Sequence, residues 1–112
     1  MININGEEWE VRLVSPFHPA LRRSDGSHTI GSCDDVVKTI YICEDVSNFY
    51  LKKVLCHELA HAAMYSYNVY MTYEQEEMMA DLIATYGQEI IALTNAMYNN
   101  LKACRECYSE KE

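Results

Sequence analysis

The chain has 112 residues, which is enough for one domain with a single core but too few for a catalytic domain beside a separate binding domain. Seventeen Asp and Glu residues against nine Lys and Arg give a formal net charge of −8, which disfavours direct binding to the phosphates of nucleic acid. The first residues show neither a basic leader nor an apolar signal core, and no stretch approaches the ~20 apolar residues of a membrane span. We therefore expect a single cytoplasmic domain over residues 1–112, with no nucleic acid or membrane as a direct partner.

Alternation between apolar and polar residues marks four strand candidates, at residues 2–4, 9–13, 28–33 and 38–43. Asn5-Gly6, between the first two, is a strong turn signal and predicts a β-hairpin. Residues 15–26 contain both prolines of the chain and predict a surface loop. In the fourth segment Ile40 and Ile42 share one face. These segments predict a small, mostly antiparallel sheet.

The residues after the fourth strand candidate have the pattern of an amphipathic helix. Ser47 or Asn48 can cap its start, and the helix is expected to reach about Tyr67. Its apolar stripe, which would hold the helix against a core, consists of Leu51, Leu55, Leu59 and Ala62.

This helix carries the pattern H-E-x-x-H at His57, Glu58 and His61. At about 100° per residue the two imidazoles lie within roughly 40° of each other, so both can reach one ion. Glu58 lies on the flank of the same face, where a carboxylate can take a proton from water as a general base. The spacing therefore predicts two zinc ligands and a catalytic base.

A second helix is expected after a connection at residues 68–71. Thr72 and Gln75 fit a capping box at its start. One apolar stripe, at steps of three and four, predicts that this helix reaches about residue 100, and it consists of Met79, Ile83, Tyr86, Ile90, Leu93, Met97 and Leu101. The small residues Ala80, Ala84 and Gly87 either permit a close approach to the first helix or are merely tolerated. Together the elements predict an α+β fold, with the small sheet packed on the H-E-x-x-H helix and a long C-terminal helix.

A catalytic zinc site usually takes three protein ligands, so the two histidines need a partner. We expect Glu77 to be this ligand, because Asp81 follows on the same face and can accept the free N–H of a ligating histidine. Glu76 points about 100° away from Glu77, toward a different surface. Glu74 lies in the frayed first turn. Both are expected to complement the helix dipole instead.

The motifs resemble those of a known family. H-E-L-A-H at residues 57–61, followed by E-x-x-x-D at residues 77–81, resembles a gluzincin, and residues 31–42 are similar to the ImmA/IrrE-like metallo-endopeptidases of bacteria, their phages and mobile elements. The resemblance implies a minimal zincin that binds one Zn²⁺ per chain through His57, His61 and Glu77, with Glu58 as base. Several members of that family cleave or inactivate repressors in the cytoplasm.

The predicted reaction is zinc-dependent hydrolysis of a peptide bond in a protein or peptide substrate. A donor to the developing oxyanion is also needed, and six candidates stay open: Tyr65, Tyr67, Tyr70, Tyr73, His18 and His28. The alternative function is a latent or inactive zinc-binding module that acts through protein–protein contacts, with the cleft covered by residues 99–112. The stripe of the long helix could also serve a dimer, so monomer and homodimer both stay open.

Five cysteines cannot all pair within one chain, and an intracellular location favours reduced thiols. Cys104 and Cys107 form a C-x-x-C pair, but the chain has no second such pair to complete a four-ligand zinc site. We expect them to be unligated thiols on a helix.

Overall fold

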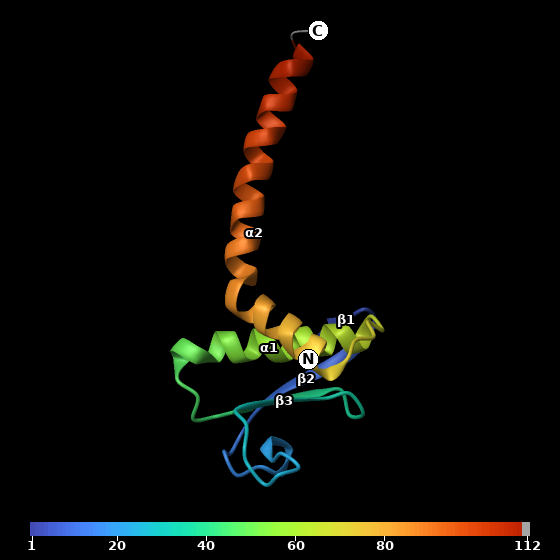
Figure 1. Cartoon of the computed structure of the whole chain (residues 1–112), viewed down its shortest axis with the longest axis vertical. Coiled ribbons are helices and arrows are strands. Elements are labelled where there is room, and N and C mark those ends of the chain that lie inside the picture. The colour runs from blue at the N-terminus through green and yellow to red at the C-terminus, as the bar shows by residue number, and fades with distance from the viewer. Residues whose placement is uncertain (111–112) are drawn as a thin grey trace.

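The computed structural model describes the chain from residue 1 to residue 110, with side chains up to residue 106. Its architecture is α+β, with a four-stranded mixed sheet and two helices, of which the second is long (Figure 1). The strands are β1 (Ile2–Ile4), β2 (Glu7–Val14), β3 (Gly31–Asp34) and β4 (Thr39–Cys43). The helices are α1 (Asn48–Ser66) and α2 (Tyr73–Glu110), and a short 3₁₀ helix, η1 (Pro19–Leu21), lies between β2 and β3. Within the described residues no helix has both the length and the apolar character needed to cross a membrane.

The strands lie side by side in the order β1-β2-β4-β3. β1 and β2 form the predicted hairpin, and Asn5 (φ 52°) and Gly6 (φ 83°) both adopt the left-handed conformation that a tight two-residue turn requires. β3 and β4 are also antiparallel, but the central pair, β2 and β4, is parallel. The sheet is therefore mixed: two of its three strand pairs are antiparallel, as the expected mostly antiparallel sheet requires, and the parallel central pair was not predicted. The chain passes from β2 to the far edge at β3 before it returns, so β4 runs in the same direction as β2.

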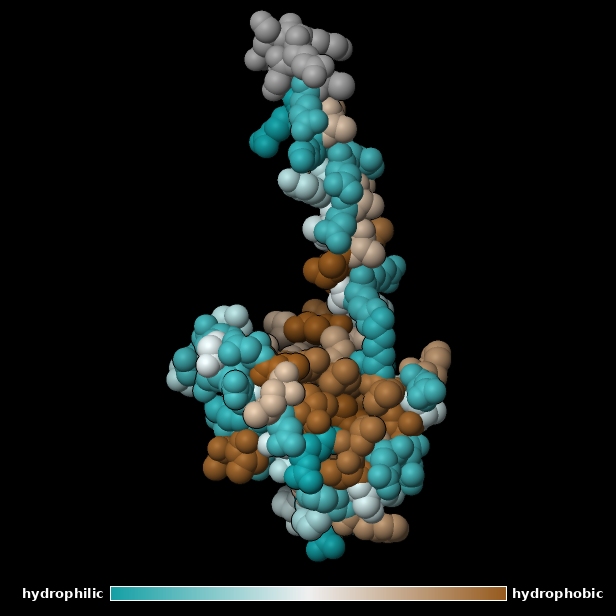
Figure 2. Space-filling model, turned by 180° about the vertical axis from the view of Figure 1, so that it is seen from behind, coloured by the Kyte–Doolittle hydropathy of each residue, from teal (hydrophilic) through white to brown (hydrophobic). Residues whose placement is uncertain are grey.

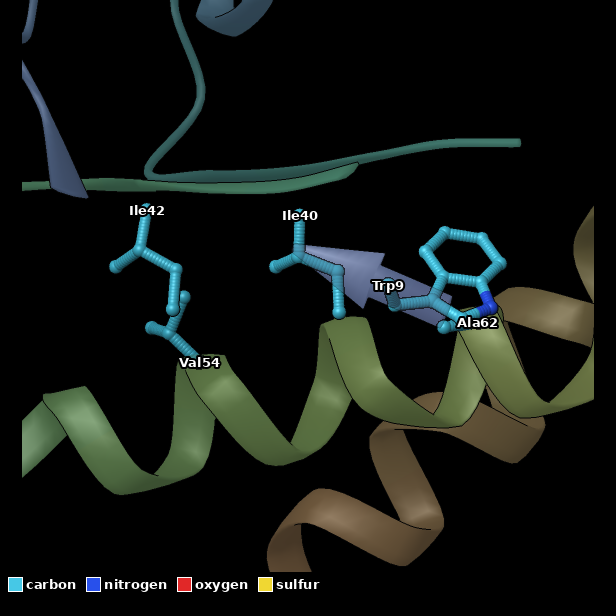
Figure 3. Packing of buried hydrophobic residues seen from close by; sticks show 5 residues of the cluster. All are labelled: Trp9, Ile40, Ile42, Val54 and Ala62. Atoms are coloured by element: carbon cyan, nitrogen blue, oxygen red, sulfur yellow. The ribbon is translucent and has the colours of Figure 1, made fainter. Parts of the chain in front are cut away.

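The main core lies between the sheet and α1 (Figure 3). Trp9, Ile40 and Ile42 extend from the sheet toward Val54 and Ala62 of α1, and all five side chains are buried. Three half-buried leucines of the predicted apolar stripe also pack against this cluster: Leu51, Leu55 and Leu59. The apolar face of α1 is therefore held on the sheet. This packing fixes the rotation of α1 about its own axis and, with it, the direction in which the histidines point.

We expect Trp9→Ala to cause a large loss of stability. The indole ring is fully buried in the core, and its Nε1–H donates a 2.8 Å hydrogen bond to Ser66 Oγ. Removing it should lower the free energy of unfolding by about 3–5 kcal/mol, as measured by urea denaturation. Phe17 is a matched aromatic control because it is 79% exposed, and Phe17→Ala should change the same quantity by less than ~0.5 kcal/mol. Equal losses in the two variants would contradict this account of the core.

The capping box predicted for the start of α2 is present. Thr72 Oγ1 accepts a hydrogen bond from the Gln75 N–H at 3.2 Å, and Gln75 Oε1 accepts one from the Thr72 N–H at 3.1 Å. About two turns into the helix, Ala80 is fully buried against Ala60 and Met64 of α1. This small residue sets the closest approach of the two helices.

Beyond this contact α2 continues to Glu110, further than the expected end near residue 100. The expected end was set by the last residue of the apolar stripe, but residues 102–106 contain neither Gly nor Pro and extend the helix. A Cβ added to Gly87 would meet only the side chain of Ile83 in the same helix. Of the three small residues, Ala80 therefore makes the close helix contact, while Gly87 lies away from it.

Candidate metal centre

The two histidines of α1 point into a shared space. His57 and His61 are one turn apart, and their Nε2 atoms lie 3.2 Å from each other. His61 is buried and His57 is half-buried. The geometry agrees with the spacing argument from the sequence, because the opposite face of α1 is occupied by the core and both rings must turn the same way.

α2 brings a carboxylate to the same point. Glu77 Oε1 lies 2.9 Å from His61 Nε2, and Glu77 Oε2 lies 3.6 Å from His57 Nε2. His57, His61 and Glu77 each offer one ligand atom, and these three atoms all lie within 4.8 Å of one another. The helix crossing at Ala80 is what places Glu77 here, since residues three apart on a helix are neighbours.

Each histidine also has a carboxylate at its other nitrogen. Asp81 Oδ1 lies 3.0 Å from His57 Nδ1, in the position expected from its spacing to Glu77. Glu76 Oε1 lies 2.6 Å from His61 Nδ1. Because an ionised carboxylate only accepts, each of these contacts suits an N–H at Nδ1 and directs Nε2 of the same ring toward Glu77.

The expectation that Glu76 turns toward a different surface is therefore wrong. The face that α2 turns toward α1 is centred on Ala80, and Glu76 and Glu77 precede this residue by four and three positions. The two glutamates flank the buried position, so both reach the histidines despite the angle of about 100° between them. The signal was present in the sequence as the small residue Ala80. Glu74, by contrast, is exposed in the first turn, as expected.

Glu58 is buried beside this cluster, with 7% of its surface exposed. Burial raises the pKa of its carboxyl to about 7, while His61 opposes the shift and the Glu77 carboxylate adds to it. Space for this side chain is provided by Gly31 at the start of β3. A Cβ at this glycine would lie 2.9 Å from Val54 Cγ1 and 3.1 Å from Glu58 Cγ. The edge strand and α1 therefore enclose Glu58 between them.

We expect Gly31→Ala to destabilise the protein at this contact. The added methyl group needs Val54 or Glu58 to move, which costs about 1–3 kcal/mol in the free energy of unfolding. A glycine with free space around it supplies the reference, since a Cβ at Gly87 meets only Ile83 at 3.4 Å or more. Gly87→Ala should be neutral or stabilising by up to ~1 kcal/mol because Ala favours a helix. Thermal unfolding of both variants measures the difference, and an unchanged midpoint for Gly31→Ala would refute the close packing.

These residues line a cleft of about 800 Å³ that runs between β3, α1 and the first turns of α2. The sequence did not point to the remaining wall, which includes Arg23, Tyr50 and Lys53. Of the six candidate oxyanion donors, Tyr65 and Tyr73 line the cleft. Burial, followed by the Glu76 carboxylate, raises the pKa of Tyr65, so its hydroxyl stays protonated.

The other four candidates, His18, His28, Tyr67 and Tyr70, are not part of the cleft wall. His18 instead accepts a hydrogen bond from the Ala20 N–H through Nδ1 and stacks on Tyr41. His28 makes an edge contact with Phe17. Their places in the loop are explained by local packing.

One cysteine lies at the site, and two others lie on α2. Cys33 lines the cleft, and burial raises the pKa of its thiol. Cys104 is free and exposed, while the side chain of Cys107 lies outside the described residues.

From residue 99 to residue 110 the chain is part of α2, which leads away from the body, and the cleft wall includes no residue of this segment (Figure 1). The described part of the segment thus leaves the cleft uncovered.

Comparison of the chain with models of protein families, with curated proteins and with solved structures gave no match.

Proposed function

We propose that the protein is a zinc-dependent metallo-endopeptidase that hydrolyses peptide bonds of a cytoplasmic protein substrate. The observation that carries this proposal is the convergence of the Nε2 atoms of two histidines and a carboxylate on one point, with Glu58 buried at its side. All three groups are electron-pair donors, so a cation between them would relieve their mutual repulsion. The motif resemblance to ImmA/IrrE-like enzymes agrees with this reading of the geometry.

The donor set fits zinc in particular. Two imidazole nitrogens and one carboxylate form a common catalytic set for this ion and leave a fourth position open. In this chain they are His57, His61 and Glu77, with Asp81 and Glu76 holding the two rings by their Nδ1 atoms. Zinc bound here supplies a Lewis acid that polarises the scissile carbonyl and lowers the pKa of a water molecule toward ~7.

The chain's own residues have separate roles in this reaction. Glu58, buried beside the three ligands, takes the proton of the attacking water and delivers it to the leaving amine. Tyr65 and Tyr73 lie in the cleft wall, where their hydroxyls can donate to the developing oxyanion.

The test is cleavage mapping in a mixture of unfolded proteins, with the zinc-loaded protein beside the same protein after chelation. We expect about one zinc per chain and new peptide termini that appear in the zinc-loaded sample alone. Readdition of zinc should restore cleavage. Zinc held at one per chain with no cleavage of any substrate would favour the rival function, a zinc-binding module that acts by protein–protein contacts. Failure to bind zinc would overturn both.

A further inference from the structure

The part of α2 beyond its contact with α1 stands away from the body. The helix has 38 residues, which corresponds to about 57 Å at 1.5 Å per residue, and the whole molecule measures 66 × 30 × 28 Å. Figure 1 shows its outer half without a neighbouring element. From residue 88 to residue 106 every residue of α2 is exposed, so this segment lacks packing within the described chain.

The composition of this segment is unsuited to a helix surrounded by water. Residues 82–101 are twenty residues with a single charge, Glu89, so no Glu–Lys pairs are available to stabilise an isolated helix. The apolar stripe predicted from the sequence is exposed here, with 37% to 64% of each surface open, and its members are Met79, Ile83, Tyr86, Ile90, Leu93, Met97 and Leu101. Most of the stability of a helix in a protein comes from packing of such a face. The segment therefore needs a partner.

The stripe has the spacing of a self-pairing helix. Ile83, Ile90 and Met97 recur every seven residues, and Tyr86 and Leu93 fall three residues after the first two. These are the two core positions of a heptad repeat, and β-branched residues at the first with Leu at the second favour two-stranded pairing. The neighbouring flank positions are small or uncharged apart from Glu89, so the chain's net charge of −8 does not enter the seam.

The available area is sufficient for a stable pair. The exposed stripe offers on the order of 700 Å² per copy, or about 1,400 Å² for two copies, which falls in the range of specific interfaces. The body adds to it, because Figure 2 shows a wide hydrophobic area at the foot of α2 with further hydrophobic side chains up the helix. Val11 and Leu13 lie on the same face of the sheet as Trp9, yet both side chains are exposed. Apolar surface thus continues from the helix to the body.

We propose that α2 pairs with α2 of a second copy of this chain along the stripe from Ile83 to Leu101, so that the protein is a homodimer held by its long helices. The stripe lies on the side of α2 opposite Glu77 and Asp81, at roughly 200° around the helix axis from them at 100° per residue. Pairing therefore leaves the cleft of each copy open. The inference concerns assembly alone and does not depend on zinc or on peptidase activity.

The experiment is a sedimentation-equilibrium series over protein concentration with the full chain. The wild type should have twice the mass of one chain. Ile90→Glu should raise the dimer dissociation constant by ~100-fold or more, because each copy would bury an unpaired charge in the seam. Ile90→Ala removes apolar contact without adding charge and should shift the constant in the same direction by a smaller factor.

Asn95→Glu is the matched control, since it adds the same charge at an exposed position on the opposite side of the helix. It should leave the dimer unchanged. Fluorescence of the single tryptophan, Trp9, confirms that the body of each variant is folded. A wild type with the mass of one chain at every concentration would overturn the proposal. A dimer that persists in both Ile90 variants, or one that Asn95→Glu disrupts equally, would also overturn it.

Discussion

Replacement of Glu58 by Gln should reduce peptide hydrolysis by at least ~100-fold, and by as much as ~10,000-fold, while about one zinc per chain remains bound. Gln has the shape of Glu, so the packing of this buried side chain against Gly31 and Val54 is preserved. An amide cannot accept the proton of the attacking water, however, and no other carboxylate takes that place, because Glu76, Glu77 and Asp81 are each engaged with a histidine nitrogen.

The measurement is the rate of cleavage of a substrate identified by terminus mapping, with zinc content determined on the same preparation. Glu10→Gln makes the same chemical change on an exposed strand residue and should leave the rate unaltered. Full activity in Glu58→Gln would remove this residue from the mechanism. Loss of zinc together with activity would assign it a structural role in the site.

Zinc affinity should fall furthest in Glu77→Ala, by clearly more than 100-fold, because this change would delete one of the three ligands of the proposed site. Asp81→Ala and Glu76→Ala should each reduce it by about 10- to 100-fold, since these carboxylates act through the rings of His57 and His61 rather than on the ion. The ordering tests the assignment of direct and indirect partners.

Competition with a chromophoric chelator measures all three constants. Glu74→Ala serves as the control, because Glu74 lies in the same first turn of α2 and is exposed. It should bind zinc as the wild type does. If Glu74→Ala weakened binding most, or if Glu76→Ala were silent, the arrangement of α2 over α1 described above would be wrong.

The parts of this fold that follow from local pattern could be predicted from the sequence. The hairpin at Asn5-Gly6 and the capping box at Thr72 were predictable because each depends on residues two or three positions apart. The parallel pairing of β2 with β4 depends on the path of the chain between them, and alternation within a strand carries no information on its neighbour's direction.

The candidate site also has one part that follows from local pattern and another that depends on how the two helices pack. The positions of His57, Glu58 and His61 relative to one another follow from the period of one helix. The role of Glu76 depends on how α2 rotates as it crosses α1, which is set by the burial of Ala80 between Ala60 and Met64. Angles within a single helix could not provide that orientation. The small residue that determines it was visible, but its partner on the other helix was not.

The parallel pairing of β2 with β4 also bears on how the chain folds. The β1–β2 hairpin closes through a two-residue turn, so it can form early and without the rest of the protein. Before Val11 can pair with Ile40, the long loop that carries η1 and β3 must close. The side chain of Ile40 is then buried only when α1 supplies Val54 and Ala62. We therefore expect the hairpin to wait, with Trp9 exposed, until synthesis has passed the end of α1. Only then does the tryptophan move from water into the core.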